Sequence, residues 1–93
     1  MLNAKELFEN LGYIQEISQN QDIVYIKNDP ETEMNRIGRM KIKKIIFVWN
    51  TKEIKIVEHY KFSNTIQFQP SQVYVLNLDE ILSMEKQVHE LSW

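Results

Sequence analysis

Two histidines, His59 and His89, are the side chains of this sequence best suited to catalysis. Neither lies in an HExxH or HxH pattern or at another metal-ligand spacing, so the sequence predicts no metal site. No serine stands in a nucleophile elbow. Loops that cradle phosphate are rich in glycine, and the chain has two glycines, Gly12 and Gly38. We therefore expect that the protein is not an enzyme and that it uses no cofactor, metal or small-molecule substrate.

The most strongly charged stretch of the chain is basic. Five of its 11 Lys and Arg residues fall between positions 36 and 44, namely Arg36, Arg39, Lys41, Lys43 and Lys44. Alternate side chains of a strand share one face, so Lys41 and Lys43 are expected beside Phe47 and Trp49. Cations interleaved with rings suit single-stranded nucleic acid, and a small nucleic-acid-binding module that uses the basic strand 36–44 is one hypothesis. No nucleic-acid-binding motif accompanies this stretch, and lysine is common on solvated strands, which is the preferred interpretation.

The same strand is apolar on both faces in its second half. Ile46 and Val48 alternate with Phe47 and Trp49, so a single helical layer would leave one apolar face to be covered. Two explanations stand beside each other. Either the segment 61–77 folds across the second face, or that face binds protein, because aromatic residues concentrate at interface centres. Self-association as a symmetric homodimer is the favoured form of the second explanation. The predicted protein-interaction residues are Phe47, Trp49 and Tyr60, with Lys41 and Lys43 at the rim.

Composition limits the kinds of protein this chain can be. Ninety-three residues predict one domain over 1–93, and 43% hydrophobic with 26% charged residues is ordinary for a globular protein. There is no cysteine, which excludes disulfides and thiolate metal sites. No signal-peptide pattern opens the sequence, and no apolar run approaches the ~20 residues that span a bilayer. We expect a cytoplasmic protein with no membrane association, and a net charge of −2 gives no general attraction to nucleic acid.

Near its two ends the chain repeats one helix-start signal, "LNAKEL" and "LNLDEI". Asn3 and Asn77 can cap a helix, and Glu6 and Glu80 stand three residues later, where a capping box needs them. Gly12 then ends the first helix. Two capped helices are therefore predicted, a short one at the start and a longer one at the end.

The helices are expected to supply one half of the core. Apolar residues at helical spacing predict its members: Leu7, Phe8, Leu11, Ile81, Met84, Val88 and Leu91. In the second helix the charged residues Glu80, Lys86 and Glu90 are expected on the solvent side.

Between the helices, the sequence has the alternation of strands. Tyr13–Ser18 and Ile23–Lys27 flank a polar turn, and Met40–Trp49 and Ile54–Tyr60 flank another. "TIQF" and "VYVL", within 61–77, are short candidate strands. The predicted fold class is α+β: a four- to five-stranded antiparallel meander with a short N-terminal helix and a longer C-terminal helix packed on one face.

Both ends of the chain carry short signatures that point to a family. Leu-Gly-Tyr at 11–13 and Glu-Leu-Ser-Trp at 90–93, together with the residues before them, resemble small uncharacterised phage and prophage proteins of Gram-positive bacteria. Such proteins open with a capped helix ending in Leu-Gly-Tyr, continue through a few strands, and end on a helix closing in Glu-Leu-Gly-Trp. The resemblance covers about residues 3–27 and 77–93.

The resemblance implies an accessory protein made in an infected or lysogenic bacterial cell, but no particular activity. Together with the residues above, it leads to the hypothesis of a non-enzymatic protein that binds another protein or itself. This hypothesis includes interference with a host defence or a host enzyme. The chain departs from the family pattern at Ser92, where the relatives carry glycine. A left-handed residue there costs serine on the order of 1 kcal/mol, so the packing of Trp93 on the last turn depends on whether Ser92 adopts that conformation.

Overall fold

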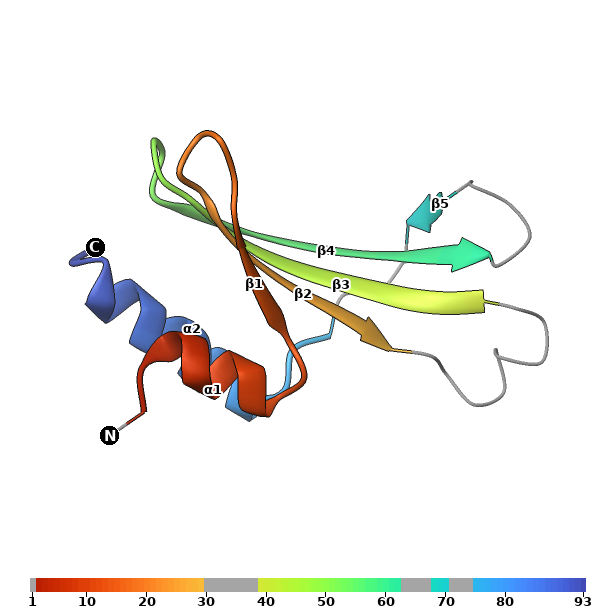
Figure 1. Cartoon of the computed structure of the whole chain (residues 1–93), viewed down its shortest axis with the longest axis horizontal. Coiled ribbons are helices and arrows are strands. Elements are labelled where there is room, and N and C mark those ends of the chain that lie inside the picture. Colours follow the sequence, from red (N-terminus) through yellow and green to blue (C-terminus); the bar gives the residue numbers. More distant parts are fainter. Residues whose placement is uncertain (1, 30–38, 63–67, 71–74) are drawn as a thin grey trace.

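The computed structural model describes residues 2–29, 39–62, 68–70 and 75–93. The elements are α1 (Ala4–Asn10), β1 (Ile14–Ile17), β2 (Ile23–Asp29), β3 (Arg39–Val48), β4 (Glu53–Phe62), β5 (Phe68–Pro70) and α2 (Leu78–Glu90). The strands form one antiparallel sheet in the order β1-β2-β3-β4-β5. Figure 1 shows the two helices side by side on the same side of this sheet. The predicted α+β meander is confirmed.

Both hairpins expected from the sequence are present, with bounds that differ by a few residues. The turn between β1 and β2 places Gln21 at a φ of 66°, and the turn between β3 and β4 places Lys52 at 56°. Of the two short strands expected later, the one at 65–68 shares Phe68 with β5, and its residues 65–67 lie outside the described residues. The other falls on residues 73–76, of which 73 and 74 lie outside the described residues and the rest are not in a strand.

An aromatic cluster forms the core between the sheet and the helices. Its buried members are Phe8, Tyr13, Tyr25, Ile45 and Phe47. Phe8, from α1, stacks on Tyr25 with ring centroids 3.9 Å apart, and Phe47 meets both rings edge-on. Residues paired across antiparallel strands share one face, so the register of Tyr25 with Ile45 fixes the helix side of the sheet. The packing of the helices therefore decides which face of each strand is buried.

Both helices begin as the sequence predicts. The side chain of Asn3 accepts from the Glu6 N–H at 2.8 Å, and Glu6 accepts from the Asn3 N–H in return. Asn77 and Glu80 repeat the same reciprocal pair at the start of α2. Each pair satisfies N–H groups that a helix leaves without intrahelical partners, which fixes where the chain turns helical.

The two helices also end in the same way. In α1, Gly12 has a φ of 94° and the Tyr13 N–H donates to the Phe8 carbonyl, a Schellman motif. At the end of α2, Ser92 takes the corresponding left-handed conformation, with a φ of 58°. The Trp93 N–H then donates to the Val88 carbonyl, and the Trp93 ring lies 6.2 Å from that of Phe47. Serine thus adopts the glycine conformation, and Trp93 packs on the core.

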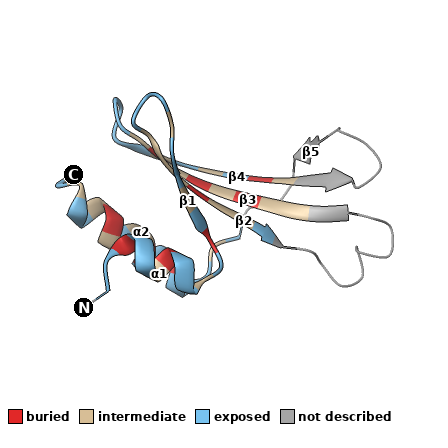
Figure 2. Cartoon of the chain, viewed as in Figure 1, coloured by how far each residue is buried: buried red, intermediate tan, exposed pale blue. Residues whose placement is uncertain are grey.

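The buried side of α2 differs from the one expected. Ile81 was expected in the core, yet it is 46% exposed, as are its neighbours Leu78 at 68% and Leu82 at 50%. Glu80, which was expected in solvent, is buried, together with Ser83 and Gln87 (Figure 2). Of the other residues expected in the core, Phe8 is buried. Partly buried residues pack against the aromatic cluster, namely Leu11, Met84, Val88 and Leu91. Leu7 is partly exposed at the border of a shallow groove between the helices.

Polar contacts explain this orientation of α2. Gln87 accepts a hydrogen bond from the hydroxyl of Tyr25, which also accepts one from Gln15 at 3.1 Å. Burial is the main cause that raises the pKa of Tyr25, so this phenol stays protonated and able to donate. Glu80 meets donors of its own, described below. The sheet therefore presents hydrogen-bond partners that α2 meets with its polar side.

Candidate functional site

Phe47, the first predicted interaction residue, is a core residue. It is 1% exposed and touches Phe8, Tyr25 and Trp93 through its ring. These contacts come from this chain alone, so its shielding requires no partner. Phe47 has almost no surface left to contact another protein.

Trp49 lies at a different kind of position, in the turn between β3 and β4. Trp49 is 46% exposed. Its backbone N–H donates at 2.9 Å to the side chain of Asp22, which lies in the turn between β1 and β2. It therefore remains accessible to a partner. For Tyr60, the third aromatic residue predicted for the interaction, the structure gives the backbone position in β4, and its side chain lies outside the described part.

The basic stretch is divided between the two faces of the sheet. Lys41 and Lys43 point to the helix side, and Lys44 lies on the opposite side, paired with Val57 of β4. Arg36 lies outside the described residues, as does the side chain of Arg39, whose backbone begins β3. The described lysines thus do not line one continuous surface.

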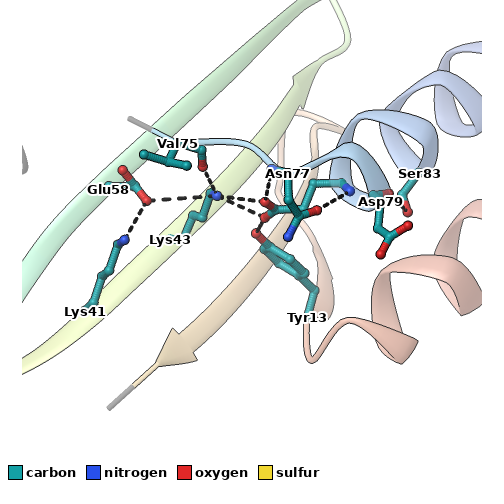
Figure 3. A network of polar contacts seen from close by, with 9 residues as sticks. Tyr13, Lys41, Lys43, Glu58, Val75, Asn77, Asp79 and Ser83 are labelled. Atoms are coloured by element: carbon teal, nitrogen blue, oxygen red, sulfur yellow. Dashed lines mark hydrogen bonds and ion pairs between the residues drawn. The ribbon is translucent and has the colours of Figure 1, made fainter. Parts of the chain in front are cut away.

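Lys43 is the centre of a buried polar network between β3 and α2. It is 8% exposed, and its ammonium donates to the Val75 carbonyl and to Glu80 at 3.0 Å (Figure 3). Glu80 also accepts a hydrogen bond from the Tyr13 hydroxyl and from the Asn77 N–H. One carboxylate therefore closes the capping box of α2 and binds the sheet at the same time.

The second carboxylate of the network, Glu58, is fully buried. Its Oε1 lies 3.1 Å from the Lys41 ammonium and 3.9 Å from the Lys43 ammonium. Glu58 is in β4 and pairs with Lys43 of β3. Neither of its oxygens receives a hydrogen bond of normal geometry from a described residue. Coulomb attraction to the two lysines thus offsets the cost of burying this charge.

Hydrogen bonds control the charge of Glu80. Burial alone would raise the pKa of this carboxyl, but donation from Tyr13, from the Asn77 N–H and from Lys43 outweighs burial and lowers the pKa below its ordinary value. A folded-state pKa below the unfolded one means that Glu80 stabilises the fold fully above the unfolded pKa, about 4.3. That contribution is lost as pH falls through the folded pKa.

A pH series with Glu80→Gln checks this charge. We expect the wild type to exceed the variant in unfolding free energy by a constant amount from pH 7 to about 5, because Glu80 is ionised in both states there. Below pH 4 the difference should shrink, since the wild type must protonate this carboxylate. Urea unfolding at each pH measures the difference. A difference that grows toward acid pH would contradict the assigned hydrogen bonds.

A cavity of about 190 Å³ lies beside this network. Its lining residues are Lys27, Lys41, Lys43, Val75, Asn77 and Glu80. The ammonium groups of Lys41 and Lys43 are already engaged with Glu58 and Glu80, and that of Lys27 lies 5.7 Å from the centre of the Tyr13 ring. These contacts join α2 to the sheet. The ammonium groups that line the cavity are therefore engaged by contacts within the fold.

The side of the sheet away from the helices carries exposed and partly exposed isoleucines and valines, and we call it the open face. Its described residues are Ile14, Glu16, Val24, Ile26, Asn28, Ile42, Lys44, Ile46, Val48, Glu53, Lys55, Val57 and His59. No described helix covers it (Figure 1). Ile14 is 67% and Val57 36% exposed, and the central isoleucines and valines are partly exposed. Sequence alternation identifies these residues as one face, but not as the face that the helices leave uncovered.

His59 lies on the open face, and its charge is set by its surroundings. Burial first, and the positive charge of Lys44 second, lower the pKa of His59 below its ordinary value. The imidazole is therefore neutral at pH 7, so it adds no second cation near Lys44.

The residues that the structure describes contain no group of three acidic or histidine side chains placed to hold a metal ion. Within the same residues, neither helix has the length and hydrophobicity needed to cross a membrane. Comparison with known proteins found no matching family model, no matching curated protein and no matching solved structure.

Proposed function

We propose that this protein is a non-enzymatic accessory protein of the phage or prophage type, and that it acts by binding protein through the open face. The Leu-Gly-Tyr and Glu-Leu-Ser-Trp signatures support the first part of the proposal. The second part depends on one observation, the uncovered isoleucines and valines of β1 to β4. Contiguous apolar surface of this kind, bordered by charges, is typical of protein-binding sites.

The open face replaces Phe47 as the centre of the proposed interaction. Ile46 and Val24 lie in its middle, on the two inner strands, and are cross-strand neighbours. Trp49 stays in the proposal as an exposed aromatic residue at the end of β3, and Lys44 is a cation within the face. A rigid sheet suits this task because its side chains are already ordered, which lowers the entropic cost of binding.

The nucleic-acid alternative has less support. Lys41 and Lys43 are turned toward Glu58 and Glu80, so their charges are compensated within the fold. Single-stranded nucleic acid needs cations and rings along one groove. Since Lys44 lies on the other side of the sheet from Lys41 and Lys43, the described lysines do not provide such a groove.

Crosslinking in nuclease-treated bacterial lysate, with tagged protein, tests the proposal. We expect the wild type to form covalent products with protein, either a second copy or another polypeptide. Ile46→Glu should reduce those products severalfold, because it places a charge in the middle of the apolar surface. In β3 this glutamate would stand opposite Lys55, so the fold should tolerate it.

The exposed apolar stripe of α2 provides the matched control. Leu82→Lys also places a charge on an exposed apolar residue, but on the helix side of the molecule. It should leave the products unchanged. If Leu82→Lys removes them and Ile46→Glu does not, α2 is the binding surface and the proposal fails. Trp49→Ala in the same series measures the part played by the turn. Products that form in untreated lysate and are absent from nuclease-treated lysate would favour the nucleic-acid alternative.

A further inference from the structure

We infer that the open face binds a second copy of this chain, by a two-fold axis that runs parallel to the strands and packs two sheets face to face. This inference rests on the proposed function, in that it names the occupant of the same surface. It is carried by the order of charges across the sheet. When a second copy faces the first with its strand order reversed, acids of one copy lie opposite bases of the other.

The row of side chains that carries the argument crosses the four strands β1 to β4. Glu16 of β1 pairs with Val24, Val24 pairs with Ile46, and Ile46 pairs with Lys55 of β4. The row thus has an acid at one edge, two apolar residues in the middle and a base at the other edge. Glu16 and Lys55 are exposed, and neither forms an ion pair with another described residue. Three strand spacings, roughly 14 Å, separate them, so they do not reach each other within one copy.

A two-fold axis along the strands reverses the order of strands and keeps each row at its own level. Glu16 then faces the partner's Lys55, and Lys55 faces the partner's Glu16. Val24 packs on the partner's Ile46 in the middle, and the same contacts repeat by symmetry. Apolar residues meet apolar residues, and both charge pairs form between copies. The slight rotation between two sheets packed face to face is compatible with this arrangement.

The neighbouring row fits the same axis. It runs from Ile14 through Ile26 and Lys44 to Val57. Reversal places Ile14, which is 67% exposed, on the partner's Val57, so the two most exposed apolar residues of the face are covered. Lys44 lies over the partner's Ile26 with its aliphatic stem, and its ammonium is close enough to turn toward the partner's Glu16.

The size of the face can be compared with that of known interfaces. Four strands about 4.8 Å apart and a few residue rows give a contact patch at the lower end of specific interfaces. Because interface area does not fix affinity, the mass of the protein must be followed over a wide range of concentration.

Sedimentation of the purified protein from about 1 to several hundred micromolar provides the test. We expect a reversible shift from the 11.2 kDa chain to twice that mass. Glu16→Lys and Lys55→Glu should each weaken dimerisation by about tenfold or more, because each places like charges opposite one another at both ends of the interface. The double variant, Glu16→Lys with Lys55→Glu, should restore dimerisation to near the wild-type level. Rescue of this kind requires that the two residues meet between copies.

Control variants separate this inference from other outcomes. Lys5→Glu makes the same charge change on α1, on the helix side, and should leave the dimer intact, and circular dichroism should show that every variant is folded. A protein that stays monomeric throughout, or a double variant that is not rescued, overturns the inference. If the chain is monomeric but crosslinks to another polypeptide through Ile46, the proposed function stands and the second copy is excluded. If none of the open-face substitutions weakens the dimer and Gln15→Pro does, the two copies pair through the edge of β1, and the inference is also overturned.

Discussion

Phe47→Ala is expected to remove about 3 to 5 kcal/mol of unfolding free energy, the cost of truncating a buried aromatic residue. The ring is 1% exposed and contacts Phe8, Tyr25 and Trp93, so its loss leaves a cavity between α1, the sheet and the residue that follows α2. A chain of 93 residues has roughly 5 to 14 kcal/mol of stability in total. The variant should therefore be marginally folded at 25 °C, as urea unfolding would measure.

Trp49→Ala is the matched control, because it removes an aromatic residue two positions away that is 46% exposed. We expect a loss of about 1 kcal/mol or less, as for other exposed positions. The pair of variants decides between core and interface for each ring. If Phe47→Ala keeps wild-type stability and loses only the binding of a partner, the core assignment of Phe47 is wrong.

Local signals in the sequence predicted the local structure well. Asn3 with Glu6 and Asn77 with Glu80 define both helix starts, since a capping box involves residues only three positions apart. Strand alternation likewise separated Ile46 and Val48 from Phe47. These features depend on the residues of one element, so tertiary contacts did not change them.

The side of α2 that packs on the sheet was not predictable in this way. Apolar residues, among them Leu78, Ile81 and Leu82, span about half of its circumference at 100° per residue, and the buried side is rotated away from the centre of that span. The choice is made by polar contacts with other elements, in which Lys43 and Tyr13 donate to Glu80. Sequence reasoning placed Glu80 in solvent because nothing local indicates that these donors, 37 and 67 residues away, will surround it.

The sequence predicted that one apolar face of β3 is left uncovered by the helices, but it did not predict which face. The sequence indicates a strand that is apolar on both sides and helices sufficient for one side, and among the described residues that is what the structure contains. The helices cover the face with Phe47 and leave the face with Ile46 uncovered. The sequence predicted the reverse, with a partner bound on the face of Phe47. The reason is again tertiary, since the aromatic residues of α1 and β2 pack on Phe47 and thereby select the covered face.

Lys43→Met is the second change with a large expected effect, about 3 to 5 kcal/mol of unfolding free energy. The buried carboxylates of Glu58 and Glu80 would lose the ammonium that lies between them, and Glu58 would depend on Lys41 alone. Methionine keeps the length and apolar stem of lysine, so the loss reports the charge rather than the packing. Lys5→Met, at an exposed pair with Glu9, should change stability by less than about 0.5 kcal/mol.

A double variant tests whether the loss comes from stranded negative charge. Lys43→Met combined with Glu58→Met removes an acid together with its base, and replacing both members of a buried ion pair by apolar residues is often close to neutral. We expect the double variant to be more stable than Lys43→Met alone by about 1 to 3 kcal/mol in urea unfolding. If the second change adds to the loss instead, Glu58 stabilises the fold through contacts other than Lys43. If it restores stability, the loss in Lys43→Met comes from negative charge left without a counter-ion in the buried network.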